Sequence, residues 1–355
     1  MPATAEPTVS AVTTPLPSPR TFRDRLAASP EGCRTVAESR ETVRRLLRKQ
    51  DDRFLVIVGP CSIHDTEAAL EYAACLAPLR DRYGDRLEIV MRAYFEKPRT
   101  SIGWRGLVSD PYLDGSFNMA EGLRRARLLL LALAEQGMPT ATELLDLATP
   151  AYFADLISFA TIGARTTESQ PHRALASSLD LPVGFKNGTD GGIEVAVNAM
   201  VSAREGHAFV AMDDDGRPCA VRSLGNAYSL LVLRGGLVSI PNYGPESVAA
   251  AETRLRAAGF DSPSLLVDAS HANSGYDPDQ QASACFSAVR QRRAGRRSLI
   301  GVMVESNLVH GKQKLAPAGG AGGLRHGVSV TDACLGWEGT AALLGELHTL
   351  LGKTV

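Results

Sequence analysis

Ionisable and metal-binding side chains stand at the end of eight short apolar segments, which cover residues 54–61, 87–94, 140–145, 159–165, 181–187, 229–236, 264–271 and 299–306. A single polar group at such a position is usually a solvated surface charge. A group at all eight ends predicts one shared site. The groups are Cys61, Arg92, Glu143, Arg165, Lys186, Arg234, Asp268 with His271, and Glu305.

Four of these groups are cationic, and the segment EKPRT at residues 96–100 adds Lys97 and Arg99. Converging Arg and Lys side chains bind phosphate and carboxylate oxygens through charge-assisted hydrogen bonds. We therefore expect a small ligand that carries several negative charges.

A second set combines a thiol, an imidazole and two carboxylates, which are Cys61, His271, Glu305 and Asp332. Taken alone, Cys61 is better explained as an inert buried thiol and His271 as a structural histidine. Their shared position at strand ends instead favours a site for a divalent first-row metal, although ligands of mixed hardness do not select one metal.

Two other polar features are assigned no role in the site. Asp213, Asp214 and Asp215 fall in a probable turn, where Asp is favoured because it bonds to the local backbone. The glycine-rich residues 316–327 lack the strand and helix context of a phosphate-binding loop.

The elements that position these groups are expected to be repeated strand and helix units. The eight apolar segments alternate with helical patterns such as residues 118–136 and 244–259. This alternation predicts a (β/α)8 TIM barrel over residues 54–355, whose site forms at the carboxyl ends of the strands. Residues 207–222 interrupt this alternation of strand and helix patterns and predict an inserted β-hairpin. Residues 21–53 are expected to be an N-terminal helical extension.

Composition excludes several classes of function. The formal net charge is -1, and no apolar segment is long enough to span a membrane, so we expect neither a nucleic-acid nor a membrane partner. Six scattered cysteines indicate reduced thiols. Residues 1–20 predict a disordered or loosely attached arm, and the alternative of a targeting segment is disfavoured by Pro15, Pro17 and Pro19. The expected compartment is the cytoplasm.

The motifs, taken in order, resemble one family. They are GPCSIHD (59–65), MRAYFEKPRT (91–100), GARTTESQ (163–170), PVGFKNGTDG (182–191), LRGG (233–236), DASHANS (268–274), GVMVES (301–306) and TDACLGW (331–337). Together they are similar to the class I 3-deoxy-D-arabino-heptulosonate 7-phosphate (DAHP) synthases of the enteric-bacterial and yeast type. The resemblance extends from about Arg34 to near the C-terminus.

The resemblance implies an enzyme that condenses phosphoenolpyruvate with erythrose 4-phosphate, the first step of the shikimate pathway, as a homodimer or homotetramer. It implies a divalent cation, Mn²⁺, Co²⁺ or Fe²⁺, bound by Cys61, His271, Glu305 and Asp332. Phosphoenolpyruvate binding is implied for Arg92, Ala164, Arg165, Lys186 and Arg234, and the erythrose 4-phosphate side for Lys97, Pro98, Arg99 and Thr100. Lys97 is the expected proton donor, and Glu143 is expected to position water.

Some features leave alternatives open. Asn307, Ala269 and Thr142 depart from the family pattern, which puts the metal preference in question. A non-catalytic homologue would tolerate the loss of site residues, but here the set is complete. A sibling synthase that uses arabinose 5-phosphate remains the alternative enzyme.

Regulation by an aromatic amino acid is expected to be altered or absent. In regulated relatives the effector pocket lies outside the barrel mouth, and Pro150, Leu179, Phe209 and Val221 would keep its apolar wall. Against binding we place three features: a carboxylate at Asp180, the loss of a hydroxyl at Ala211, and an N-terminal arm that is not suited to closing the pocket.

Overall fold

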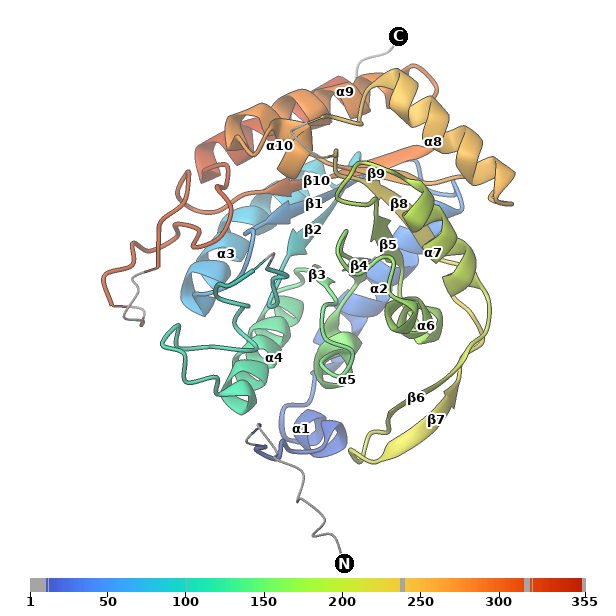
Figure 1. The fold of residues 1–355 in the computed structure, drawn as a ribbon. Coiled ribbons are helices and arrows are strands. Elements are labelled where there is room, and N and C mark those ends of the chain that lie inside the picture. Colours follow the sequence, from blue (N-terminus) through green and yellow to red (C-terminus); the bar gives the residue numbers. More distant parts are fainter. Residues whose placement is uncertain are drawn as a thin grey trace, which may run out of the picture.

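The computed structural model describes residues 11, 13–99, 101–236, 240–315, 320 and 322–352. Eight parallel strands close into a barrel in the order β1-β10-β9-β8-β5-β4-β3-β2, which confirms the predicted TIM barrel (Figure 1). They are β1 (Phe54–Gly59), β2 (Leu87–Arg92), β3 (Thr140–Glu143), β4 (Phe159–Ile162), β5 (Val183–Lys186), β8 (Ser229–Leu233), β9 (Leu265–Asp268) and β10 (Leu299–Glu305).

Helices surround the barrel in Figure 1 and bury the outer faces of the strands. Because both faces are covered, the strands are continuous apolar segments rather than alternating ones. The helices are α3 (Thr66–Tyr83), α4 (Met119–Glu135), α5 (Pro150–Phe153), α6 (Gln170–Ser178), α7 (Glu194–Arg204), α8 (Pro245–Ala257), α9 (Gln281–Arg293) and α10 (Trp337–Gly352), with the short turns η1 (Ala154–Leu156), η3 (His271–Ser274) and η4 (Pro278–Gln280).

The strand register brings the chemical groups of neighbouring strands together. In the parallel pairings of β1, Gly59 lies opposite Glu305 of β10, and Val58 lies opposite Met91 of β2. Cys61 follows β1 directly, so it emerges between the strands that end in Glu305 and Arg92. The carboxyl end of the barrel therefore gathers residues that are far apart in the sequence.

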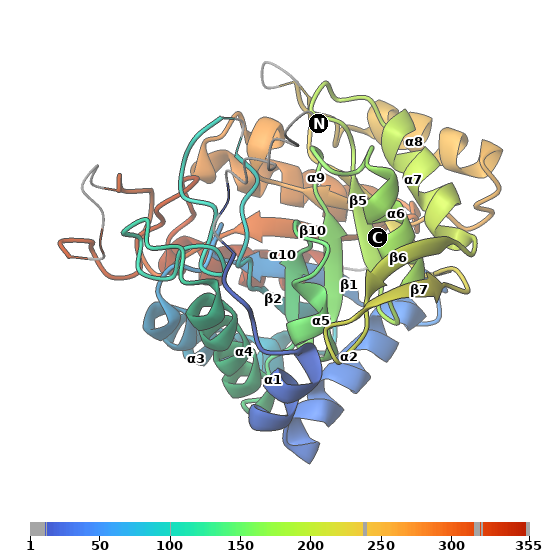
Figure 2. The same ribbon diagram turned by 60° about the horizontal axis from the view of Figure 1, so that its bottom comes forward.

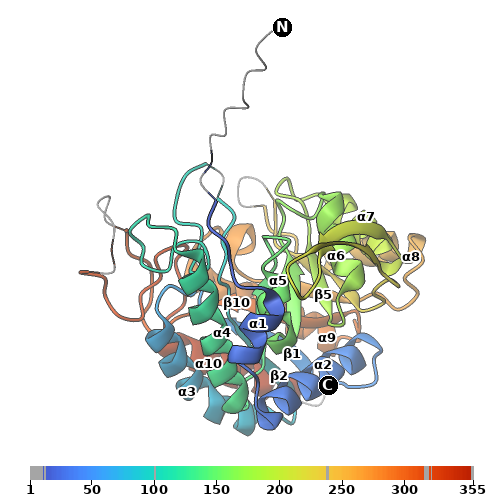
Figure 3. The same ribbon diagram turned by 90° about the horizontal axis from the view of Figure 1, so that it is seen from below.

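The N-terminal extension forms α1 (Pro19–Arg25) and α2 (Pro30–Leu47). Val43, Leu46 and Leu47 of α2 pack with the residues of the barrel interior, so α2 closes the amino end of the barrel. In Figure 3, α1 lies beside α5, and the two helices are in contact.

The structure moves the boundary of the predicted arm. Helix α1 begins at Pro19, within the segment expected to be loosely attached, and the Ser18 hydroxyl caps it by accepting a hydrogen bond from the Thr21 N–H. The Tyr152 hydroxyl donates to the carbonyl of Pro17 at 3.0 Å. Proline is compatible with the first turn of a helix, where its missing N–H has no partner to lose.

The predicted hairpin is present between α7 and β8 in the chain, and its two strands, β6 and β7, lie side by side in Figure 2. Its strands β6 (Ala208–Met212) and β7 (Pro218–Arg222) pair with each other in antiparallel register. At the turn, the Asp213 carboxylate accepts hydrogen bonds from the backbone N–H groups of Asp215 and Arg217. The carboxylates of Asp214 and Asp215 instead pair with Arg23 and Arg20 of α1. None of the helices in the described ranges is long and apolar enough to cross a membrane.

Candidate active site

A cavity of about 280 Å³ opens at the carboxyl ends of the barrel strands. Most of the residues predicted from the strand ends and the EKPRT segment line it. The exceptions are Thr100, which lies outside the described residues, and five buried residues that do not line it: Cys61, Arg92, Glu96, Asp268 and Glu305. The lining residues are Lys97, Pro98, Arg99, Ser101, Ile102, Glu143, Gly163, Ala164, Arg165, Lys186, Arg234, His271, Tyr276 and Asp332.

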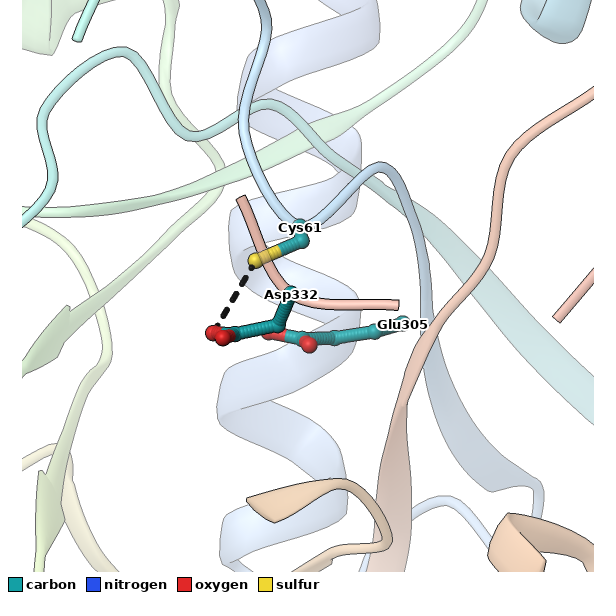
Figure 4. Close-up of side chains that lie close together, drawn as sticks. All are labelled: Cys61, Glu305 and Asp332. Atoms are coloured by element: carbon teal, nitrogen blue, oxygen red, sulfur yellow. Dashed lines mark hydrogen bonds between the residues drawn. The ribbon is translucent and has the colours of Figure 1, made fainter. Parts of the chain in front are cut away.

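Three of the four predicted metal ligands lie together beside this cavity (Figure 4). One ligand atom from each of Cys61, Glu305 and Asp332 falls within 4.8 Å of the others. The Cys61 thiol also donates a hydrogen bond to Asp332 Oδ2 at 3.5 Å. A thiol that metal binding deprotonates and two carboxylates are ligands of the kind that divalent first-row metals take. The donor set therefore fits a divalent metal ion.

The electrostatics of Cys61 agree with that fit. Burial, followed by the Glu305 carboxylate, raises the pKa of the thiol to about 12. The thiol by itself is therefore protonated at neutral pH. A bound divalent cation reverses this balance, because coordination deprotonates a thiol.

His271, the fourth predicted ligand, is not within the group of three but lines the same cavity as Asp332. Its Nδ1 lies 3.1 Å from Asp268 Oδ2 and 2.8 Å from the Ser270 hydroxyl. A carboxylate at one ring nitrogen fixes the imidazole so that the other nitrogen can coordinate a metal. Nε2 of His271 is therefore the atom available for a ligand role, and Asp268 is the group that orients it.

Several cationic side chains of the site already donate hydrogen bonds to other protein groups. Arg92 donates to the carbonyls of Pro60 and Cys61 and to Glu305 Oε1, at 3.0, 3.2 and 2.8 Å. Lys186 Nζ donates to Asp268 Oδ2 at 3.0 Å, and Lys97 Nζ donates to the Cys61 sulfur at 3.0 Å. Arg92 and Lys97 thus both contact the metal-ligand group, Arg92 through Glu305 and Lys97 through Cys61.

Glu143 lines the cavity with a carboxylate oxygen, Oε1, that is buried and has no hydrogen-bond partner among the described residues. A Cβ atom added at Gly163 would lie only 2.3 Å from that oxygen. Any other residue at position 163 would therefore displace the carboxylate. Sequence reasoning missed this role of Gly163, although the glycine that opens GARTTESQ was its signal.

Comparison with known proteins places the chain in a family. The family model of the DAHP synthetase I family matches residues 35–345. The chain belongs to the DAHP synthetase I family. The resemblance inferred from the motifs, and with it the expected enzyme class, is thereby confirmed.

Individual relatives agree with the family. The chain is 49% identical to a Tyr-sensitive phospho-2-dehydro-3-deoxyheptonate aldolase of Escherichia coli K12 over 88% of its own length and 86% of the relative's. It is 47% identical to the Phe-sensitive enzyme of the same organism over 93% and 92% of the two chains. The structure of the aldolase from Francisella tularensis SCHU S4 matches with a TM-score of 0.92 and 40% identity, covering 96% of this chain and 98% of that one.

A buried carboxyl group adjoins the loop of this DAHP synthetase I family member that carries Lys97. Glu96 is only 4% exposed, and its Oε2 accepts a hydrogen bond from the Thr149 hydroxyl at 3.0 Å. Burial is the main cause that raises the pKa of Glu96 from 4.5 to about 7. The folded protein therefore holds a proton between these two pH values that the unfolded chain releases.

Glu96→Gln is expected to stabilise the protein at pH 8 and to have little effect at pH 4.5. Above pH 7 the folded protein must hold a buried charge, so wild-type stability falls as the pH rises through the window from 4.5 to 7. The free energy of unfolding that the wild type loses across this pH window is roughly 3 kcal/mol at most. Urea unfolding at both pH values measures it. The exposed Glu346→Gln is the control, and an equal effect of both substitutions at pH 8 would contradict the assignment.

A second cavity, of about 1000 Å³, lies between α5, α6 and the hairpin. Pro150, Leu179, Phe209, Ala211 and Val221, which were assigned above to a predicted effector pocket, all line it. The structure bears on one of the three objections to effector binding. The Asp180 carboxylate does not line the cavity, because it accepts a hydrogen bond from Arg44 at 2.6 Å. Arg23 of α1, which lies beyond the arm of residues 1–20, also lines the cavity, so the objection from that arm stays a prediction.

Proposed function

We propose that the chain condenses phosphoenolpyruvate with erythrose 4-phosphate and water, giving DAHP and inorganic phosphate. The observation that carries this proposal is the cavity in which Lys97, Arg165, Lys186 and Arg234 converge beside the ligand group of Cys61, Glu305 and Asp332. Cations and a metal site together suit two phosphorylated substrates, one of which carries an aldehyde.

In the proposed reaction, Arg165, Lys186 and Arg234 bind phosphoenolpyruvate, with Arg92 beneath them. Pro98, Arg99 and Thr100 serve the erythrose 4-phosphate side. Carbon 3 of phosphoenolpyruvate forms the new bond to the aldehyde carbon, water adds at carbon 2, and phosphate leaves with cleavage of the carbon–oxygen bond. Fixing both substrates in one small cavity supplies much of the rate enhancement.

Lys97 is the proposed proton donor to the new alkoxide. Burial favours its neutral form, but the carboxylates of Glu305 and Asp332 oppose burial and the pKa of the ammonium group is raised, so the group carries a proton. Glu143 is proposed to position the attacking water through its unpaired Oε1. His271 is proposed as the fourth metal ligand. A divalent cation, Mn²⁺, Co²⁺ or Fe²⁺, polarises the aldehyde when bound.

Parallel assays with erythrose 4-phosphate and arabinose 5-phosphate test the proposal. We expect phosphate release from phosphoenolpyruvate with the four-carbon sugar in the presence of Mn²⁺ and none after chelation. Turnover with arabinose 5-phosphate but not with erythrose 4-phosphate would identify a sibling synthase. Binding of phosphoenolpyruvate without turnover of either sugar would identify a non-catalytic homologue.

We also propose that the protein assembles as a homodimer or homotetramer. The hairpin supports this, since Val210 is 80% exposed and Met212 is 41% exposed. Both residues belong to a two-stranded ribbon that pairs with no further strand in the described part of the chain, and an exposed apolar ribbon of this kind favours association with another chain. Light scattering after size-exclusion chromatography measures the mass. A monomer at micromolar concentration would contradict the proposal.

The second cavity is proposed to bind an aromatic amino acid that lowers activity, since relatives carry the names Tyr-, Phe- and Trp-sensitive. Of the earlier objections, the one from the arm of residues 1–20 stays a prediction, and Ala211 offers no hydroxyl to the ligand. Ala211→Ser is therefore expected to lower the concentration for half-inhibition by about fivefold, the size of one neutral hydrogen bond. Initial rates with each amino acid at millimolar concentration check this. Full activity of both proteins with all three would show that the cavity is not an effector site.

A further inference from the structure

Tyr276 holds an uncommon backbone conformation at the mouth of the active-site cavity. Its φ is 63°, and it follows Gly275, whose φ is 62°. Residues that carry a side chain rarely adopt this left-handed region. The Tyr276 N–H donates to the carbonyl of His271 at 2.8 Å, which closes a tight turn after η3. An outlier of this kind persists where the surrounding structure requires the side chain in one place.

The turn places the Tyr276 side chain between two groups of the site. The ring lies edge-on to the imidazole of His271, with centroids 6.3 Å apart. The hydroxyl accepts a hydrogen bond from Nη2 of Arg234 at 3.4 Å. Tyr276 is nevertheless 55% exposed, so burial of its ring does not account for its position.

Arg234 is held firmly at its backbone. Its N–H donates to Asn187 Oδ1 at 2.8 Å. The next residue, Gly235, packs so closely on η3 that an added Cβ would lie 2.8 Å from Ala272 and 2.9 Å from the backbone of Asn273. The loop that carries Arg234 and the turn that carries Tyr276 therefore form one packed unit.

The guanidinium of Arg234 is buried but sparsely bonded. The residue is 6% exposed, and among the described residues its side chain has a single hydrogen-bond acceptor, the Tyr276 hydroxyl. A guanidinium has five N–H donors, so the others remain for a ligand in the cavity that Arg234 lines. Arg92, by contrast, already donates to three oxygen atoms of the protein.

We propose that Tyr276 is a further substrate-binding residue, whose hydroxyl binds the same anionic group of phosphoenolpyruvate as Arg234. A tyrosine hydroxyl can accept from Arg234 and at the same time donate its own proton to a phosphate or carboxylate oxygen. The bond from the guanidinium polarises the hydroxyl and strengthens its donation. This inference rests on the proposed function, because it assumes that phosphoenolpyruvate is the ligand of Arg234.

Tyr276→Phe tests the inference, since it removes the hydroxyl and keeps the ring. Calorimetric titration of Mn²⁺-loaded protein with phosphoenolpyruvate is expected to show a Kd about tenfold higher than that of the wild type, the size of one hydrogen bond to a charged group. In steady-state assays the KM for phosphoenolpyruvate should rise with kcat nearly unchanged, because the contact forms in the ground state as well. Tyr112→Phe, a partly exposed tyrosine outside the cavity, is the matched control.

The outcomes separate this inference from the proposed function. An unchanged Kd in Tyr276→Phe, with normal binding by the wild type, overturns only the role of Tyr276. Failure of the wild type to bind phosphoenolpyruvate overturns the proposed function itself. If the substitution weakens Mn²⁺ binding instead of phosphoenolpyruvate binding, Tyr276 supports His271 rather than the substrate, and the inference is wrong.

Discussion

Cys61→Ala is expected to lower kcat by about a thousandfold or more while the barrel remains folded. Loss of the thiolate leaves Glu305 and Asp332 as the remaining members of the close ligand group. A metal ion contributes several kcal/mol of charge stabilisation to a polarised carbonyl, which corresponds to a rate factor of about this size. The thiol lies beyond the end of β1, so its removal leaves the strand pairing intact.

Cys285→Ala is the matched control, because Cys285 is also fully buried but belongs to α9 and is not a member of the ligand group of Cys61, Glu305 and Asp332. Both substitutions remove one buried sulfur and should cost similar stability. Steady-state assays with added Mn²⁺, together with the metal content of the purified proteins, give the comparison. A Cys61→Ala protein with near-normal kcat and bound metal would show that Cys61 is a buried thiol and no ligand.

The barrel could be predicted from the sequence because its strands are buried on both faces. Segments such as residues 54–61 and 299–306 are continuously apolar and end in a polar group, and both properties are local. Closure then places β1 between β10 and β2, so the proximity of Cys61, Glu305 and Arg92 follows from the fold class. The proximity of these three residues could therefore be predicted without knowing the conformation of any side chain.

The parts of the structure that the sequence could not predict depend on which residues, far apart in the chain, pair with one another. Asp180 was expected at the effector pocket, yet its carboxylate binds Arg44, which is 136 residues away in the chain. Pro19 was assigned to a loose arm, although Ser18 caps a helix there and Phe22 packs on Tyr152. No periodic pattern records such pairings, because each is decided by which side chains the completed fold brings within reach.

Arg92 shows the same limit, and it supplies the prediction with the largest expected effect on stability. Its position at the end of β2 indicated an anion-binding group. In the structure it is fully buried, with its guanidinium 3.6 Å from the centroid of the Tyr94 ring and 2.8 Å from the Glu305 carboxylate. Many of the N–H donors of Arg92 thus already bond to protein atoms, so its substitution affects the stability of the fold as well as ligand binding.

Arg92→Met is expected to lower the free energy of unfolding by about 3–5 kcal/mol in metal-free protein, because it leaves the Glu305 carboxylate buried without its partner. Arg124→Met, which breaks an exposed pair with Glu121, should cost no more than about 1 kcal/mol. Urea unfolding in the presence of a chelator measures both. Adding Glu305→Leu to Arg92→Met should recover part of the loss, since it removes the uncompensated charge. If Arg92→Met and Arg124→Met lowered the free energy of unfolding by the same small amount, the Glu305 carboxylate would not need Arg92 as a partner. Arg92 would then be available to bind the substrate alone.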